Sequence, residues 1–237
     1  MKRLALALVA VALCLLPAPG NTPEPCPLPC PVEGCRGEAE LNRQKNRTGE
    51  PSEYHRLTFG KFVELNNKAV NKKRRHNWTD EEKAAIAGLE DGAAAVILVG
   101  YLYDAKYSVS ESCNCFRPEK EWLDFHIWLV RDGPHSTKPE SVVVEITPRI
   151  RQTKTGWELT KLRKLIPPHR WTKVRVKGYL FFDNEHWDFP QRTPPVRATA
   201  WEIHPVIHFT VCPPQTTCRV DSEEGWVSLE NYTVGEE

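Results

Sequence analysis

The sequence has no long apolar stretch beyond residue 16. A membrane helix requires about 20 consecutive apolar residues, so no transmembrane segment is predicted. The formal net charge is only +1, and any binding of nucleic acid would therefore depend on a local basic patch. The chain also contains no internal repeat and no compact metal-ligand motif such as His-Glu-x-x-His. No ligand can be identified from these features. The position of a binding site therefore has to be predicted from the fold.

The first twenty residues have the order of a secretory signal peptide. Lys2 and Arg3 precede an apolar run from Leu4 to Leu16, and prolines and small residues follow at 17–20. We therefore expect cleavage near Gly20 and a secreted or periplasmic protein. Cys14 follows Leu13, where a lipoprotein signal would have a small residue, and this argues against a lipid anchor.

Seven of the eight cysteines lie beyond the expected cleavage site. An oxidising compartment permits disulfides, and the odd number leaves one thiol free, bonded between molecules or bound to metal. The simplest pair is Cys212 with Cys218, which closes a short loop. Cys113 and Cys115 rarely bond each other without strain, so bonds to the N-terminal cysteines are favoured over a metal site. The disulfide candidates are Cys26, Cys30, Cys35, Cys113, Cys115, Cys212 and Cys218.

Composition divides the chain into five segments. After the signal peptide at 1–20, residues 21–56 form a Pro/Cys-rich irregular arm with little capacity for a core. Residues 57–92 are a helical segment, in which Thr79 and Glu82 form a capping box. Its basic run at 72–76 fits a solvated linker better than a patch for an anionic partner. Residues 93–211 are strand-rich, and 212–237 form a tail. Three Asn-X-Thr sequons begin at Asn46, Asn77 and Asn231 and matter only in a eukaryotic secretory pathway.

The strand-rich segment has the element order of a five-stranded OB-fold-like Greek-key barrel. Gly100 and Gly178 lie inside the first and fourth strands, where curvature is needed. A mixed sheet backed by a helix is the alternative. The mainly β barrel is favoured, with its helix between strands 3 and 4 and a helical segment before it. The predicted strands are 93–107, 122–130, 141–147, 172–183 and 199–211, and the predicted helix is 155–166.

Five short stretches carry a sequence resemblance to a known family: LNRQKNR (41–47), ESCNC (111–115), DFHIWL (124–129), VEITPR (144–149) and WEIHP (201–205). Together they resemble a family of exported bacterial proteins of unknown function with an OB-like domain. The likeness covers about residues 41–211 and implies export and a barrel, but no activity. Staphylococcal-nuclease-type enzymes share the barrel, yet their Arg, Glu and Arg active-site pattern finds no match here.

Strand parity predicts a shared patch on the outside of this barrel. Side chains alternate across a strand, so apolar inward residues force their polar neighbours outward. In an OB barrel the second strand pairs with the third, and the third lies beside the fifth. The outward patch would contain Asp124, His126, Glu145, Glu202 and His204.

Imidazoles and carboxylates in one patch could bind a divalent metal such as zinc, which could activate water for hydrolysis. A simpler interpretation is that these positions are polar because water touches them, with His–Glu pairs across the sheet contributing little to stability. We favour the simpler interpretation.

A second candidate surface contains aromatic and basic side chains. OB barrels bind single strands by stacking bases on aromatic residues within a basic groove, and sugars or peptides would use the same indoles. Lys173, Arg175 and Lys177 point outward on the fourth strand, although such residues commonly form a solvated face. The candidate ligand-binding residues are Trp122, Trp128, Arg192 and Arg197.

The sequence thus predicts an exported OB-like binding or interaction module for an unknown protein, sugar or oligonucleotide. The alternative is a metal-dependent hydrolase, of phosphodiesterase or nuclease type, that uses the His/Asp/Glu patch. A third interpretation is a disulfide-tethered structural component of the envelope.

Overall fold

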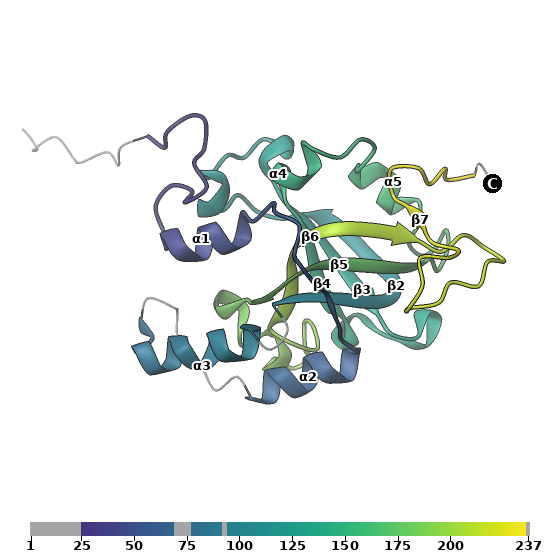
Figure 1. The fold of residues 1–237 in the computed structure, drawn as a ribbon, viewed down its shortest axis with the longest axis horizontal. Helices are drawn as coiled ribbons and strands as arrows, with labels where there is room; N and C mark the ends of the chain where they lie inside the picture. The colour runs from purple at the N-terminus through teal and green to yellow at the C-terminus, as the bar shows by residue number, and fades with distance from the viewer. Residues whose placement is uncertain (1–24, 69–76, 92–93, 236–237) are drawn as a thin grey trace, which may run out of the picture.

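Five strands close a barrel in the computed structural model, which describes residues 25–68, 77–91 and 94–235 (Figure 1). The strands follow the order β2-β3-β4-β6-β5, and β5 pairs with β2 to complete the circle. The β4–β6 pair is parallel, and the other pairs of the barrel are antiparallel. This is the predicted OB-fold-like topology. The barrel strands are β2 (Ala95–Tyr107), β3 (Phe125–Val130), β4 (Val142–Ile146), β5 (Lys173–Phe182) and β6 (Trp201–Val211).

Short elements surround the barrel. Two-residue strands β1 (His55–Arg56) and β7 (Val227–Ser228) extend the sheet beside β2 and β6. The α-helices are α1 (Ala39–Lys45), α2 (Phe59–Lys68), α3 (Asp80–Asp91), α4 (Pro148–Arg151) and α5 (Leu159–Arg163). The 3₁₀ helices are η2 (Ser112–Asn114), η3 (Lys120–Trp122), η4 (Gly133–His135), η5 (Lys138–Glu140), η6 (Asn184–His186) and η7 (Phe189–Gln191).

The barrel interior is apolar because alternate side chains point inward, as predicted. Phe125, Ile127 and Leu129 of β3 are buried in one core together with residues from every other barrel strand. Burying one such side chain stabilises the fold by about 1.5–3 kcal/mol. Gly178 allows β5 to approach β6 closely, since a Cβ there would lie 2.3 Å from the Pro205 carbonyl oxygen. The curvature predicted at this glycine thus has a steric basis.

Helices complete the core. Phe59 and Phe62 of α2 join it, and the Phe59 ring lies where a Cβ on Gly100 would clash. The predicted capping box of α3 is present, with Thr79 and Glu82 each donating a backbone N–H to the other's side chain. Figure 1 shows α2 and α3 together on one side of the barrel and α4 and α5 on another.

Two predicted elements have different bounds. The second barrel strand begins at Phe125, and Trp122 lies instead in η3. The helix expected over 155–166 is only α5, because Gly156 has a left-handed φ of 74° that interrupts a helix. A separate turn, α4, begins directly after β4, where Thr147 caps it and Pro148 occupies its first position.

The N-terminal arm is folded against the barrel and is not a free tether. Disulfides join Cys26 to Cys35 and Cys30 to Cys115, and the second attaches the arm to the β2–β3 loop. Arg149 donates to the carbonyl oxygens of Cys30 and Pro31, both at 2.7 Å.

Asn46 also holds the arm against the β2–β3 loop. Its amide donates to the carbonyl oxygens of Val32 at 3.0 Å and Cys113 at 2.8 Å. The arm therefore contributes α1 and a hydrogen-bonded cover to the molecule.

The predictions for the remaining cysteines are only partly confirmed. Cys212 and Cys218 form the expected local disulfide. Cys113 was a disulfide candidate, but it is a free, buried thiol because its neighbour Cys115 takes the bond to the arm. The expected signal peptide and the basic run at 72–76 lie outside the described residues. In the part of the chain that is described, no helix has the length and apolar character needed to span a membrane.

Candidate functional site: a buried polar cluster under the arm

A cluster of ionisable side chains lies on the outer face of the barrel, beneath the arm and the β2–β3 loop. Asp124 and His204 are 0% exposed, Glu202 2% and Glu145 5%. Strand register brings them together, since His126 is paired with Glu145 and Glu202 with Val143. The predicted convergence is present, but the interpretation of this surface as water-exposed is wrong, because the arm and η2 cover it.

His204 lies among three carboxylates. Its Nδ1 is 3.2 Å from Glu202 Oε1 and 3.4 Å from Glu145 Oε2. Its Nε2 is 3.6 Å from Asp124 Oδ2. The ring of Phe181 contacts the imidazole, with 5.5 Å between centroids. The residues predicted on three different strands therefore meet around one histidine.

His126 occupies the edge of the cluster. Its Nδ1 lies 2.9 Å from Glu145 Oε1, and its side chain is 19% exposed. Thus Glu145 contacts a histidine through each of its two oxygens, His126 through one and His204 through the other.

Among the carboxylates and histidines of the cluster, three atoms are buried without a hydrogen-bond partner among the described residues. They are Asp124 Oδ2, Glu145 Oε2 and His204 Nε2. An unsatisfied buried polar atom costs about 1–3 kcal/mol, and more when it is charged. Asp124, Glu145 and His204 each offer a ligand atom, and these atoms lie within 4.8 Å of one another. One atom from each of the three residues could therefore ligate a single cation.

Burial shifts the protonation of the cluster. It raises the pKa of Glu145 well above its usual range, and Glu202 raises it further. Burial also raises the pKa of Asp124. For His204 burial acts in the opposite direction, but Glu145 and Glu202 outweigh it and raise the pKa to about 9. Burial lowers the pKa of His126 to about 4. The metal-free cluster thus relies on protons to limit its negative charge.

Residues outside the barrel strands complete the cluster. Arg197 Nη1 lies 2.9 Å from Glu202 Oε2, and its Nη2 lies 2.7 Å from Asp183 Oδ2. Asp124 accepts a hydrogen bond from Asn114 at 2.9 Å. Lys45 of α1 forms an ion pair with Glu111 of the β2–β3 loop.

Sequence reasoning missed Lys45, Glu111, Asn114 and Asp183 as members of the cluster. The first three lie in the arm and the β2–β3 loop, where no periodicity indicates the direction of a side chain, and Asp183 ended a predicted strand. The LNRQKNR and ESCNC stretches, which contain the first three residues, were the sequence signals at these positions.

The expected aromatic ligand surface is not formed. Trp128 is buried, with the His126 ring 4.3 Å from it and the Lys138 ammonium 3.8 Å above it. Arg197 is buried in its two ion pairs. Both expectations were wrong, because loops cover this side of the barrel.

The other basic and aromatic candidates have local partners. Trp122 lies under Arg117 at 4.8 Å, and Arg192 pairs with Asp188 at 2.9 Å. Arg175 was expected in a solvated row, but it is buried and pairs with Glu223 of the C-terminal tail.

The two described cavities lie away from the cluster. One of about 230 Å³ is lined by residues that include Phe59, Val63 and Arg131. The other, of about 400 Å³, is lined by residues that include Tyr101, Trp171 and Tyr232.

Comparison with known proteins gives no match to a family model, a curated protein or a solved structure.

Proposed function

We propose that this protein is an exported OB-like binding module whose ligand is a divalent metal ion, held by Asp124, Glu145 and His204. The observation that carries the proposal is that each of these three residues has a buried atom without a hydrogen-bond partner and offers a ligand atom within 4.8 Å of the others. Glu145 and His204 lie on adjoining strands, and Asp124 directly precedes β3. The three disulfides support export, since such bonds persist in oxidising compartments. The resemblance to exported bacterial proteins stays a prediction.

The charges of the cluster favour a cation. Five carboxylates face three cationic groups, and the raised pKa values of Glu145 and Asp124 favour protons on the surplus carboxylates. A divalent cation could take the place of those protons. Burying a charge without a partner is strongly unfavourable for folding. If this face of the barrel only supported the fold, apolar side chains would stabilise it equally well. Arg149 and Arg151 border the cluster, but their guanidinium groups donate to backbone carbonyls. The carboxylates are Glu111, Asp124, Glu145, Asp183 and Glu202, and the cations are Lys45, Arg197 and His204.

The ligand set suits zinc better than calcium. A histidine nitrogen with two carboxylate oxygens is a common zinc set, whereas calcium takes six to eight oxygens. Two ligands of one tetrahedral zinc stand about 3.4 Å apart, given metal–ligand bonds of about 2.1 Å. His204 Nε2 and Asp124 Oδ2 are already 3.6 Å apart.

Burial favours binding over catalysis. A hydrolytic zinc site keeps one ligand position open to water and substrate. Asp124 and His204 have no solvent exposure in this structure, so a substrate could not reach an ion bound there. The hydrolase interpretation would require the arm to leave the barrel.

The test is metal binding by the oxidised, purified protein. After chelator treatment, zinc is titrated in competition with a chromophoric chelator, and elemental analysis gives the bound metal. We expect at least one equivalent for the unchanged chain, and Asp124→Asn and His204→Gln to weaken binding at least tenfold.

The matched control is His208→Gln. His208 lies on the same strand but pairs at the surface with Glu50 at 2.8 Å, so its loss should leave zinc affinity unchanged. Absence of bound zinc in the unchanged chain, or equal affinity in all folded variants, would overturn the proposal. Near-ultraviolet circular dichroism establishes that each variant is folded.

A further inference from the structure

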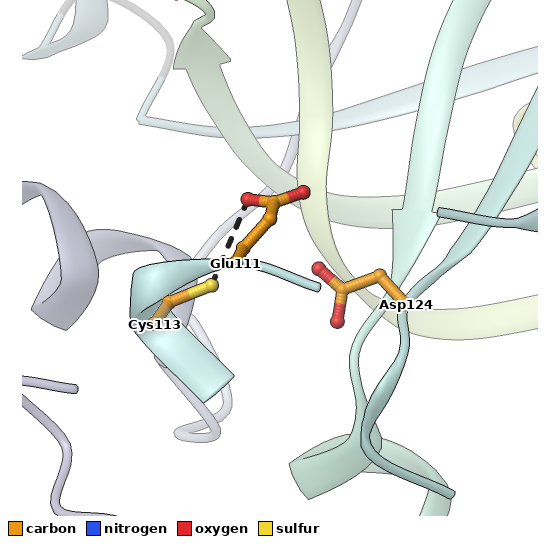
Figure 2. A group of neighbouring side chains, drawn as sticks. All are labelled: Glu111, Cys113 and Asp124. Atoms are coloured by element: carbon orange, nitrogen blue, oxygen red, sulfur yellow. Dashed lines mark hydrogen bonds between the residues drawn. The ribbon is translucent and has the colours of Figure 1, made fainter. Parts of the chain in front are cut away.

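A second group of ligand atoms adjoins the first and shares Asp124 with it. Glu111, Cys113 and Asp124 each offer an atom, and these atoms lie within 4.8 Å of one another. Figure 2 shows the Cys113 sulfur directed toward the Glu111 carboxylate, while the Asp124 carboxylate faces both from the residue that directly precedes β3. Two potential metal positions therefore meet at one carboxylate.

Cys113 is unusual among the described cysteines. The other six form disulfides, and Cys115, two residues away, is one of them. Cys113 is wholly buried, yet its sulfur lies 3.8 Å from Glu111 Oε2 in polar surroundings. A buried thiol commonly packs as a small apolar side chain, and one that lies beside a carboxylate is also placed to ligate a metal.

Asp124 supplies an independent indication of a ligand. Its side chain is completely buried, and Asn114 satisfies only Oδ1. Oδ2 has no hydrogen-bond partner among the described residues. A carboxylate bridges two ions through its two oxygens, so Oδ2 would bind the first ion and Oδ1 would exchange its hydrogen bond from Asn114 for the second. In Glu111, Lys45 holds Oε2, and the same oxygen lies 3.8 Å from the Cys113 sulfur.

We propose that Glu111, Cys113 and Asp124 hold a second divalent metal ion beside the first, with the Asp124 carboxylate bridging the two. This inference rests on the proposed function. On binding, the S–H bond of Cys113 breaks, a sulfur–metal bond forms, and the proton passes to water. Thiolate ligation selects zinc-like ions over magnesium and calcium.

Cobalt(II) tests the inference, because a thiolate bound to cobalt gives a charge-transfer band in the near ultraviolet. The oxidised full chain, freed of metal, is titrated with cobalt chloride. We expect two equivalents to bind, with the thiolate band present. Cys113→Ser should bind one equivalent and lose the band, and Glu111→Gln should weaken the second equivalent at least tenfold. His208→Gln should match the unchanged chain.

The outcomes separate this inference from the proposed function. Absence of any bound cobalt or zinc overturns both. One equivalent without a thiolate band, unchanged in Cys113→Ser, overturns only the second position. One equivalent with a thiolate band shows a single ion at Cys113 and also overturns the two-ion arrangement. If Cys113→Ser does not fold, Glu111→Gln decides the same question, since it keeps every cysteine.

Discussion

Asp183 connects the buried cluster to a histidine at the molecular surface. Its Oδ2 lies 2.7 Å from both Arg197 Nη2 and His186 Nδ1. Although burial alone would raise the pKa of Asp183, Arg197, His186 and Lys45 together outweigh it and the pKa is lowered. His186 also packs on Phe189, with 4.3 Å between ring centroids. The carboxylate therefore stays ionised and can support a protonated His186.

Replacing His186 should produce a pH-dependent loss of stability. The hydrogen bond with Asp183 raises the pKa of His186, despite opposing effects of burial and Arg197. A raised folded-state pKa stabilises the fold below the unfolded value of about 6.5, and this contribution disappears as pH rises through the folded value. His186→Asn should therefore lower the free energy of unfolding near pH 5 by up to about 1 kcal/mol, because the side chain is 45% exposed.

Urea unfolding at about pH 5 and about pH 9 measures this effect. The difference between His186→Asn and the unchanged chain should be larger at the lower pH and small at the higher one. His169→Asn, at an exposed histidine before β5, is the control. An equal difference at both pH values would show that the Asp183 contact does not act through the charge of His186.

At the scale of elements, alternation was sufficient to predict the barrel and the side of it on which each strand residue lies. Phe125 and Ile127 are in the core, and Asp124 and His126 are on the opposite side, as period-two alternation requires. Alternation does not say what covers the opposite side. Trp128 therefore looked like a ligand-binding indole although it is buried under Lys138.

Gly178 is the position where one methyl group should most disturb the barrel. A Cβ would lie 2.3 Å from Pro205 O and 2.7 Å from Ile203 Cγ2, and the first of these is backbone that cannot turn aside. Gly178→Ala should lower the free energy of unfolding by about 1–3 kcal/mol, as overpacking does. A shift of the urea midpoint at constant slope measures the loss.

The matched control is Gly88→Ala in α3. Gly88 is exposed, and nothing lies within 4 Å of an added Cβ. Alanine there should stabilise the protein by about 0.5–1 kcal/mol through helix propensity. Equal effects of the two substitutions would mean that the close approach of β5 to β6 does not exist in solution.

At the scale of the whole molecule, the Cys30–Cys115 disulfide joins positions 85 residues apart. In the chain-entropy account, a disulfide that closes a loop of that length stabilises the folded protein by about 4–5 kcal/mol. The Cys212–Cys218 disulfide, with a sequence separation of 6, would contribute only about 2 kcal/mol. Replacing Cys30 and Cys115 with alanine should therefore destabilise the chain more than replacing Cys212 and Cys218. Melting temperatures of the two double variants measure this order, and the reverse order would contradict the arm's role.

Contacts between residues far apart in the sequence explain why the position of the arm could not be predicted. The arm has many prolines and no apolar period, so its sequence indicated a tether. Its position depends on a disulfide and on hydrogen bonds to the β2–β3 loop, which local patterns do not encode. The burial of the cluster follows from that position. Sequence therefore located Asp124, Glu145 and His204 together, but it could not show that they are shielded from water.

The anchoring of Asn46 has a consequence for how the protein can be produced. Both amide hydrogens are engaged, by Val32 and Cys113, and the residue is 3% exposed. An oligosaccharide attached at this sequon in a yeast or mammalian cell would replace one of those hydrogens and fill the space where α1 meets the loop. Material from such hosts would carry a displaced arm, and a bacterial periplasm is the suitable source.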